Sequence, residues 1–407
     1  MARKPATKIQ ERDIVGLKYF DRLMPLFERL HDVGTERDRA GNRTLFFDQY
    51  CAYILLFLFN PIVTSLRGIQ QASELQRVQK KLGCARAALG SLSEATQVFD
   101  PEPLKEIVQE LAGQLQPLGN DRQFPEVKHL LTAVDGTVVK TLSRIVQAAY
   151  LKSPTDGQSR SAWRLHTHFE LERGLPVRID VTGAGGQGAA DERTVLRQAL
   201  EADRCYVLDR GYAQFSLFDE IVEHQSSYVC RVKDNTVYEV VERRPLTAAA
   251  REACVLSDMI VQLGRAAEDR PQHPVRLVFV LTTAHDKRGK TGGGTLGQRS
   301  DGVIRIATNL LDVPAEVIAF IYQKRWLIEI FFRFLKHILG CRHLLSTDPV
   351  GIEIQAYCAI IACLLIALWT GKKPTKRTYE MICFYFIGWA SEEELLAHLE
   401  KLQAQKA

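Results

Sequence analysis

One stretch in the last third of this chain carries charge on an apolar background. YQKRWLIEIFFRFLK, residues 322–336, mixes Trp, Leu, Ile and Phe with five charged side chains and a tyrosine. A helix advances about 100° per residue, so it would place the tyrosine and four of the charges within roughly 80° of arc: Tyr322, Arg325, Glu329, Arg333 and Lys336. The pattern predicts a helix that is buried around most of its circumference and presents one narrow, mostly basic stripe.

A charged stripe on such a helix has two interpretations. It can be a surface stripe held by ion pairs at i,i+4 spacing, Arg325–Glu329 and Glu329–Arg333. It can instead face a partner or a wet cleft, because an unpaired buried charge is very costly. The narrowness of the stripe favours the second interpretation, and we expect the apolar neighbours, Trp326 and Ile330 among them, to pack in the core.

Length and composition set broad limits. A chain of 407 residues predicts two or three domains, and its formal net charge of +5 permits a nucleic-acid partner without requiring one. Nine cysteines without a CxxC pair fit a reduced, cytoplasmic chain, and the first residues lack a secretory signal. Two apolar runs, 50–63 and 356–369, are shorter than the roughly 20 residues that span a bilayer. We therefore expect buried core helices and no membrane association.

The order of predicted elements indicates an α/β fold. Residues 1–127 read as helices, and β-branched and apolar residues then predict three strands, 129–142, 161–174 and 175–184, the last two forming a hairpin. Helix, strand, helix and strand follow up to residue 234, with Asp209 at the end of the strand 205–212. Three mostly antiparallel strands followed by alternating helices and strands are the element order of a ribonuclease H-like domain.

The remainder completes a predicted domain plan. Strand-like segments between 235 and 310 predict a β-rich insertion, and Pro314 begins a long helix that contains residues 322–336. The plan is a helical, DNA-binding amino-terminal domain (1–127), a first part of the ribonuclease H-like catalytic core (128–234), the β-rich insertion (235–310), the last helix of the core (311–345) and a carboxyl-terminal helical region (346–407). By pattern alone, residues 1–127 could equally form a helical cap that only packs.

Three carboxylates have the placement that a metal-dependent nuclease needs. Asp135 lies in the first predicted strand and Asp209 ends a later one, and these two strands are neighbours in a ribonuclease H-like sheet. Glu329 is the one acid among cations on the striped helix. Such a trio can hold two Mg²⁺ ions, which activate a water or a 3′-hydroxyl, while flanking Arg and Lys side chains bind phosphates.

The spacing Tyr-x2-Arg-x3-Glu-x6-Lys, from Tyr322 to Lys336, resembles the signature of hairpin-forming DDE transposases of the insertion-sequence-4 type. VDGTVV around Asp135 and VLDRGY around Asp209 are similar to the two Asp motifs of that family. The resemblance covers about residues 129–345 and extends more loosely to the helical amino-terminal part.

The resemblance implies a function and its residues. Asp135, Asp209 and Glu329 would be the catalytic, metal-binding carboxylates for two Mg²⁺ (or Mn²⁺) ions. The residues that would contact DNA are Tyr322, Arg325 and Lys336, to which the stripe adds Arg333. The reaction would be cut-and-paste transposition through a DNA hairpin, with inverted-repeat ends and target DNA as partners and at least two protomers in the assembly. The setting would be a bacterial cytoplasm, in association with the nucleoid.

Other interpretations stay open. Gly183, Gly185 and Gly188 match a G-x-G-x-x-G dinucleotide fingerprint, although the preceding strand is the return arm of a hairpin. His166 and His168 share one face of a strand, where packing is the expected role, and RGKT at 288–291 is expected to be a basic hairpin tip. A catalytically inactive, transposase-derived DNA-binding protein is the remaining alternative.

Overall fold

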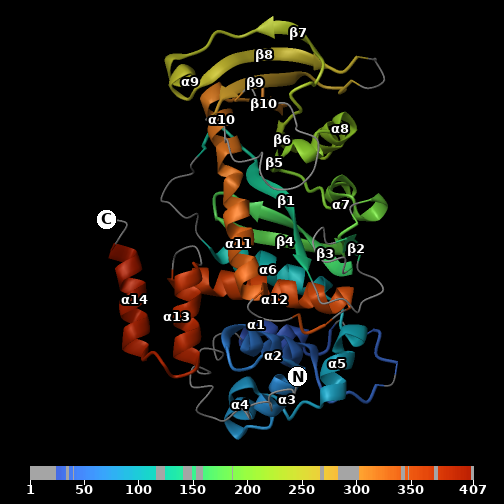
Figure 1. The fold of residues 1–407 in the computed structure, drawn as a ribbon, viewed down its shortest axis with the longest axis vertical. Helices are drawn as coiled ribbons and strands as arrows, with labels where there is room; N and C mark the ends of the chain where they lie inside the picture. The colour runs from blue at the N-terminus through green and yellow to red at the C-terminus, as the bar shows by residue number, and fades with distance from the viewer. Residues whose placement is uncertain are drawn as a thin grey trace.

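The described strands of this chain join into one ten-stranded sheet. The computed structural model describes residues 24–33, 36–39, 41–115, 124–140, 149–152, 159–185, 187–265, 270–282, 302–340, 344–346, 348–370 and 375–404. Figure 1 shows the sheet running through the upper and middle parts of the molecule, with the amino-terminal helices below it.

The amino-terminal part is helical over its described residues, as the sequence predicts. Its elements are α1 (Met24–Phe27), the short 3-10 helix η2 (Glu28–Leu30), α2 (Phe47–Phe59), α3 (Leu66–Ser73), α4 (Gln76–Leu82), α5 (Leu89–Val98) and α6 (Glu102–Gln114). Nearly every side chain of α2 is buried, which explains why its sequence is apolar on all sides.

The catalytic-core strands pair in the predicted order. They are β1 (Leu130–Lys140), β2 (Ala149–Lys152), β3 (Ser159–Glu170), β4 (Leu175–Gly183), β5 (Arg204–Leu208) and β6 (Ser227–Arg231). β1 pairs antiparallel with β3 and β3 antiparallel with β4, while β1, β5 and β6 pair in parallel. The arrangement β4-β3-β1-β5-β6 is the one expected for a ribonuclease H-like sheet; the short edge strand β2 was not predicted.

The predicted β-rich insertion extends this same sheet. Its strands are β7 (Tyr238–Arg243), β8 (Val255–Leu263), β9 (Val275–Leu281) and β10 (Val303–Thr308), with the short helix α9 (Ala248–Glu252) between the first two. β10 pairs antiparallel with β6, and β9, β8 and β7 follow outward. The insertion is therefore hydrogen-bonded to the core strands, and the predicted domain boundaries stay predictions.

A buried ion pair ties the insertion to the segment that leads into the next helix. Arg276 on β9 makes a two-point contact with Asp258 on β8, with nitrogen–oxygen distances of 2.8 and 2.7 Å. The same guanidinium donates to the main-chain carbonyls of Leu310, Leu311 and Val313. Because Arg276 and Asp258 are both buried, this contact fixes the start of α10 (Ala315–Lys324) relative to the insertion.

Helices cover both faces of the sheet. α7 (Glu192–Gln198) and α8 (Phe215–Glu223) belong to one face, where Leu217, Phe218 and Ile221 pack with Tyr206 and Tyr228 of the sheet. α10, α11 (Trp326–Gly340) and α12 (Pro349–Thr370) belong to the other face. α10 and α11 run along the sheet from the insertion down to α12 (Figure 1).

α12 lies between the sheet and the amino-terminal helices, in contact with β4, α6 and α2. By length and composition its 20-residue stretch Pro349–Leu368 could cross a membrane, and 83% of that stretch is buried inside the protein. The sequence prediction of a run of about 14 residues was too short, because Val350, Ile352 and Ile354 extend it. Its prediction of burial is confirmed. α13 (Lys376–Phe386) and α14 (Glu392–Ala404) follow as a helical hairpin.

Two predictions about residues 322–336 were wrong. The single long helix is divided at Arg325, where the bonds Arg325 N–H to Tyr322 O and Ile328 N–H to Arg325 O each span only three residues. Trp326 and Ile330, expected in the core, are 53% and 45% exposed. The reason is that the buried residues of α11, which are Ile328, Phe331, Phe332, Phe334 and Leu335, leave the side that carries Trp326 and Ile330 facing solvent.

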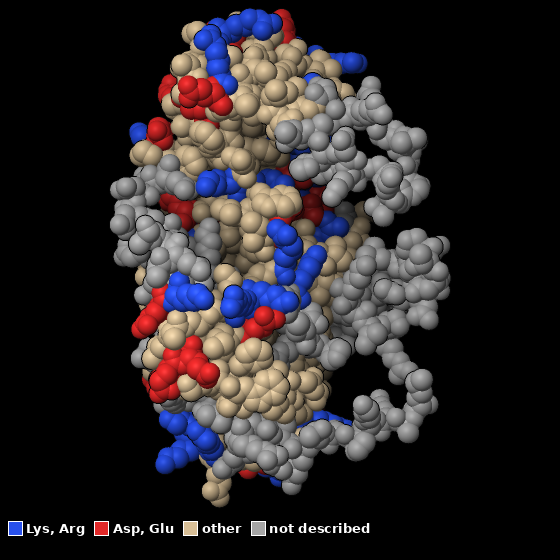
Figure 2. All heavy atoms as spheres, turned by 60° about the vertical axis from the view of Figure 1, so that its left-hand side comes forward, with Lys and Arg blue, Asp and Glu red and all other residues tan. Residues whose placement is uncertain are grey.

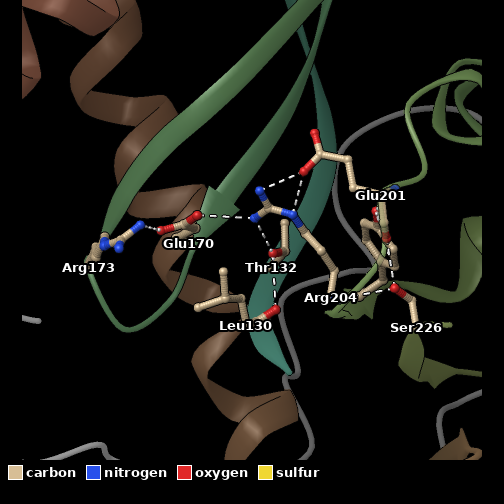
Figure 3. Close-up of polar contacts among 8 residues, drawn as sticks. Leu130, Thr132, Glu170, Arg173, Glu201, Arg204 and Ser226 are labelled. Atoms are coloured by element: carbon tan, nitrogen blue, oxygen red, sulfur yellow. Dashed lines mark hydrogen bonds and ion pairs between the residues drawn. The ribbon is translucent and has the colours of Figure 1, made fainter. Parts of the chain in front are cut away.

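A polar network fixes the register at the amino-terminal ends of β1 and β5. Arg204, the first residue of β5, contacts Thr132 of β1, the buried Glu170 of β3 and Glu201 (Figure 3). Arg173 also pairs with Glu170. One guanidinium thus joins the three strands that carry the core of the sheet.

Loss of this guanidinium should destabilise the fold. Arg204→Met leaves Glu170 buried with less compensation, so the free energy of unfolding should fall by about 2–4 kcal/mol in urea titrations. Arg197→Met, which breaks the more exposed pair Arg197–Glu220, is the control and should cost less than about 1 kcal/mol. Equal losses for both variants would contradict a special role for the network.

Glu353 of α12 should make stability depend on pH. Burial raises its pKa to about 7, Lys105 lowers it, and Asp180 raises it further. A carboxyl whose pKa is raised on folding stabilises the protein below its unfolded pKa, and this contribution is lost as pH rises through about 7. Glu353→Gln should therefore have a higher melting temperature than the wild type at pH 8 and the same one at pH 4. A difference independent of pH would show that only packing changed.

Candidate functional site

Asp135 and Asp209 lie side by side at one edge of the parallel part of the sheet. The parallel pairing of β1 and β5 ends with Val134 opposite Leu208; Asp135 is the next residue on β1, and Asp209 directly follows the end of β5. Neighbouring strands are about 4.8 Å apart, so the two residues begin within a few ångströms of each other. The prediction that their strands are neighbours is confirmed.

Local structure orients both aspartates. Oδ1 of Asp209 accepts a hydrogen bond of 2.6 Å from the N–H of Gly211, and so caps the 3-10 turn η4 (Arg210–Tyr212). Oδ1 of Asp135 accepts one of 2.8 Å from the N–H of Gly136. In each case Oδ2 carries no such main-chain contact within the described part of the chain, so it can face a ligand.

Glu329 reaches the same place from α11 through an arginine. Arg325 Nη2 lies 2.6 Å from Glu329 Oε1, and Arg325 Nη1 lies 3.4 Å from Asp135 Oδ2. The predicted i,i+4 pair is therefore real, and it also connects α11 to β1. The guanidinium bridges two of the three predicted carboxylates.

The surroundings of Asp135 disfavour its charged form. Burial raises its pKa to about 6; the Arg325 guanidinium and the Gly136 N–H lower it, and the charges of Asp209 and Glu192 raise it. A partly buried carboxylate with other carboxylates close to it is typical of a cation-binding site.

The remaining predicted DNA contacts line the same helix pair. Tyr322 is half-buried at the end of α10, and burial raises its pKa, whereas Arg325 and Arg231 lower it. Arg333 and Lys336 are exposed on α11, and the Arg333 guanidinium lies 5.8 Å from the centre of the Trp326 ring. Figure 2 shows Lys and Arg side chains gathered across the middle of one face of the molecule, with acidic side chains recessed among them.

Sequence reasoning missed several residues at this site. Arg231, the last residue of β6, lowers the pKa of Tyr322, and its buried Nε has no hydrogen-bond partner among the described residues. Glu192 and Arg164 form an ion pair against Gly136. The buried hydroxyl of Tyr212 has no hydrogen-bond partner within the described part of the chain, and burial together with the charges of Glu192, Asp135 and Asp209 raises its pKa. Tyr212 could have been found from sequence, because it belongs to the motif VLDRGY. Arg231 and Glu192 could not, because only the positions of the strands and helices in space bring them to the site.

The donor chemistry of the site fits Mg²⁺ or Mn²⁺, because three carboxylates supply the hard oxygen ligands that these ions prefer. The Arg325 guanidinium already acts as a stand-in cation between two of them. Within the described part of the chain no three His, Cys, Asp or Glu residues are yet arranged to hold a metal ion.

The glycines of the alternative dinucleotide-binding motif do not lie in a parallel β-α-β unit. β4, which precedes Gly185 and Gly188, pairs with β3 and is not adjacent to β5, so no parallel β-α-β unit surrounds the glycines. His166 and His168 are buried, as expected for packing residues. RGKT at 288–291 lies outside the described residues.

Gly136 should be required for the approach of Glu192. A Cβ at this position would lie 2.5 Å from Glu192 Oε1 and 3.3 Å from Arg164 Cδ. Gly136→Ala should lower the free energy of unfolding by about 1–3 kcal/mol, and the double variant with Glu192→Ala should recover part of the loss in urea titrations. Gly113→Ala, where no atom lies within 4 Å, is the control and should not destabilise. A loss that Glu192→Ala does not relieve would contradict the steric explanation.

Comparisons with known proteins identify the family of this chain. The family described as "Transposase DDE domain" matches residues 126–365. A "Putative transposase for insertion sequence element IS4SA" from Synechocystis is 45% identical over 69% of this chain and 71% of its own length. A "Putative transposase y4zB" from Sinorhizobium fredii is 28% identical over 63% of this chain, and a "Probable transposase for insertion sequence element IS5377" from Geobacillus stearothermophilus is 29% identical over 64%.

The aligned parts are limited in length. This chain spans 65% and 61% of the lengths of the Sinorhizobium and Geobacillus relatives. A solved piggyBac transposase synaptic complex with hairpin DNA aligns over 95% of this chain and 81% of its own, at 10% identity and a TM-score of 0.41.

Proposed function

Since this chain belongs to the transposase DDE domain family, we propose that it is a cut-and-paste transposase that cleaves the ends of an insertion sequence and joins them to target DNA. The observation that carries the proposal is the meeting of Asp135, Asp209 and the Arg325–Glu329 pair at one edge of the sheet. The strand order supports it, because the two aspartates stand on adjacent parallel strands.

The proposed catalytic residues are Asp135, Asp209 and Glu329, which would hold two Mg²⁺ or Mn²⁺ ions. When bound, such ions supply an activated nucleophile and neutralise charge at the leaving oxygen. Tyr322, Arg325, Arg333 and Lys336 would bind backbone phosphates, the arginines through two parallel N–H groups and the lysine as a point charge. Apolar packing of α11 on the sheet would hold Glu329 beside the two aspartates.

The proposed reaction is that of the hairpin-forming, insertion-sequence-4 type. Water attacks the phosphodiester at the element's end and frees a 3′-hydroxyl. That hydroxyl attacks the opposite strand, which closes a hairpin and releases the flanking DNA. A second water opens the hairpin, and the 3′-end then joins target DNA. Each step displaces one oxygen from one phosphorus, so the same phosphate-binding side chains serve all four.

The proposed partners follow from the same chemistry. The substrates are double-stranded inverted-repeat ends and target DNA, and the two ends of an element call for a dimer or larger assembly. The proposed setting is the bacterial cytoplasm, in association with the nucleoid.

Cleavage of an inverted-repeat end is the direct test. Asp135→Asn, Asp209→Asn and Glu329→Gln should each reduce Mg²⁺-dependent cleavage of a duplex with the element's terminal repeat by at least about 10³-fold, because the three carboxylates act as one unit. Binding of the duplex should persist. Glu239→Gln, on the exposed strand β7, is the control and should cleave normally. Binding without cleavage by the wild type would instead favour the inactive DNA-binding protein.

A further inference from the structure

The Arg325 guanidinium occupies the gap between two carboxylates. One of its terminal nitrogens contacts Glu329 and the other contacts Asp135, at 2.6 and 3.4 Å. The three side chains are only 14%, 32% and 22% exposed for Arg325, Glu329 and Asp135, so solvent screens these contacts less than it would on an open surface. The arginine therefore restrains the positions of the Asp135 and Glu329 carboxylates through its own two contacts.

The contacted oxygens are also proposed metal ligands. The guanidinium uses lone pairs of Asp135 Oδ2 and Glu329 Oε1 that a divalent ion would also use, and two cations so close together would repel each other. We propose that Arg325 competes with the divalent metal for Asp135 and Glu329, and that DNA binding removes this competition. The inference rests on the proposed function, whose carboxylates it shares.

The arginine can leave without a change of fold. Arg325 stands at the division between α10 and α11, and its side chain has several rotatable bonds beyond Cβ. A DNA phosphate beside Tyr322 would offer the guanidinium two anionic oxygens in place of the two carboxylates. The carboxylates then become available at the moment when the substrate arrives.

Coupling of the two events follows from thermodynamics. If DNA draws Arg325 from the carboxylates, DNA must strengthen metal binding, and metal must strengthen DNA binding by the same factor. The protein without DNA would then hold metal weakly. Cleavage away from the element's ends would be limited for the same reason.

Manganese binding without catalysis tests the competition. Titration of Mn²⁺ into DNA-free protein, followed by electron paramagnetic resonance, should show about tenfold tighter binding for Arg325→Gln than for the wild type, the size expected from loss of one modest competing ion pair. Arg325→Lys should give an intermediate value, because a lysine cannot contact both carboxylates through a planar fork. Arg333→Gln removes the same charge from the same helix pair, at a side chain that lies over Trp326 and has no ion pair with either carboxylate in the described structure, and should leave DNA-free Mn²⁺ affinity near that of the wild type.

A second titration tests the coupling. A duplex with the terminal inverted repeat should tighten Mn²⁺ binding to the wild type, with Ca²⁺-free buffer and a short reaction time, and should have little effect on Arg325→Gln. Equal Mn²⁺ affinity for the wild type and Arg325→Gln, or equal tightening of both by DNA, would overturn the inference. Circular dichroism confirms that each variant is folded.

Failure of the inference is distinct from failure of the proposed function. If Asp135→Asn and Glu329→Gln weaken Mn²⁺ binding while Arg325→Gln does not strengthen it, the carboxylates are the metal ligands and only the competition is wrong. If the two carboxylate variants bind Mn²⁺ as the wild type does, the site assignment itself is wrong, and the competition with it.

Discussion

The parallel pairing of β1 with β5 is the constraint on which the site depends. Its register puts Val134 opposite Leu208, and an aspartate directly follows each of them. At the other end of the same pair, Arg204 joins β5 to Thr132 and Glu170, so a slip of the strands would break a buried ion pair. The contacts of Arg204 thus fix the register at the amino-terminal end of the strand pair. At the carboxyl-terminal end of β5, the same register places the carboxylates of Asp135 and Asp209 next to each other.

α11 adds the third carboxylate from outside the sheet. Its inner side chains pack on the sheet, and Glu329 stands between that packed side and the solvent. Arg325, at the division from α10, connects Glu329 to Asp135 across two elements that are 190 residues apart in sequence. Packing of α11 on the sheet and the ion pair of Arg325 with Glu329 together position the third carboxylate of the site.

Much of this arrangement was predictable from sequence because it follows local periodicity and element order. The strand neighbours of Asp135 and Asp209, the helical amino-terminal part and the Arg325–Glu329 pair all follow from such patterns. The exposure of Trp326 does not, because an apolar helix gives no signal of which side lacks a neighbour. Arg231 and Glu192 were missed because each is brought to the site by tertiary structure.

The contacts of Arg325 with Asp135 and Glu329 show why the spacing of residues along the sequence does not fully predict the site. The spacing from Tyr322 to Lys336 correctly indicates that the polar residues share a region, but it does not show that one cation already satisfies two acids. That contact depends on the distance between α11 and β1, which no single segment encodes.

The insertion is continuous with the catalytic strands through β6 and β10, and Arg276 holds the main chain just before α10. Among the described residues, strand hydrogen bonds and a buried ion pair therefore connect the outer strands to the helix that carries Tyr322. A DNA duplex that contacted both the insertion and the carboxylates would bind at two points whose separation is fixed by these contacts. The distance between its two contacts would be set by the hydrogen-bonded framework of the protein.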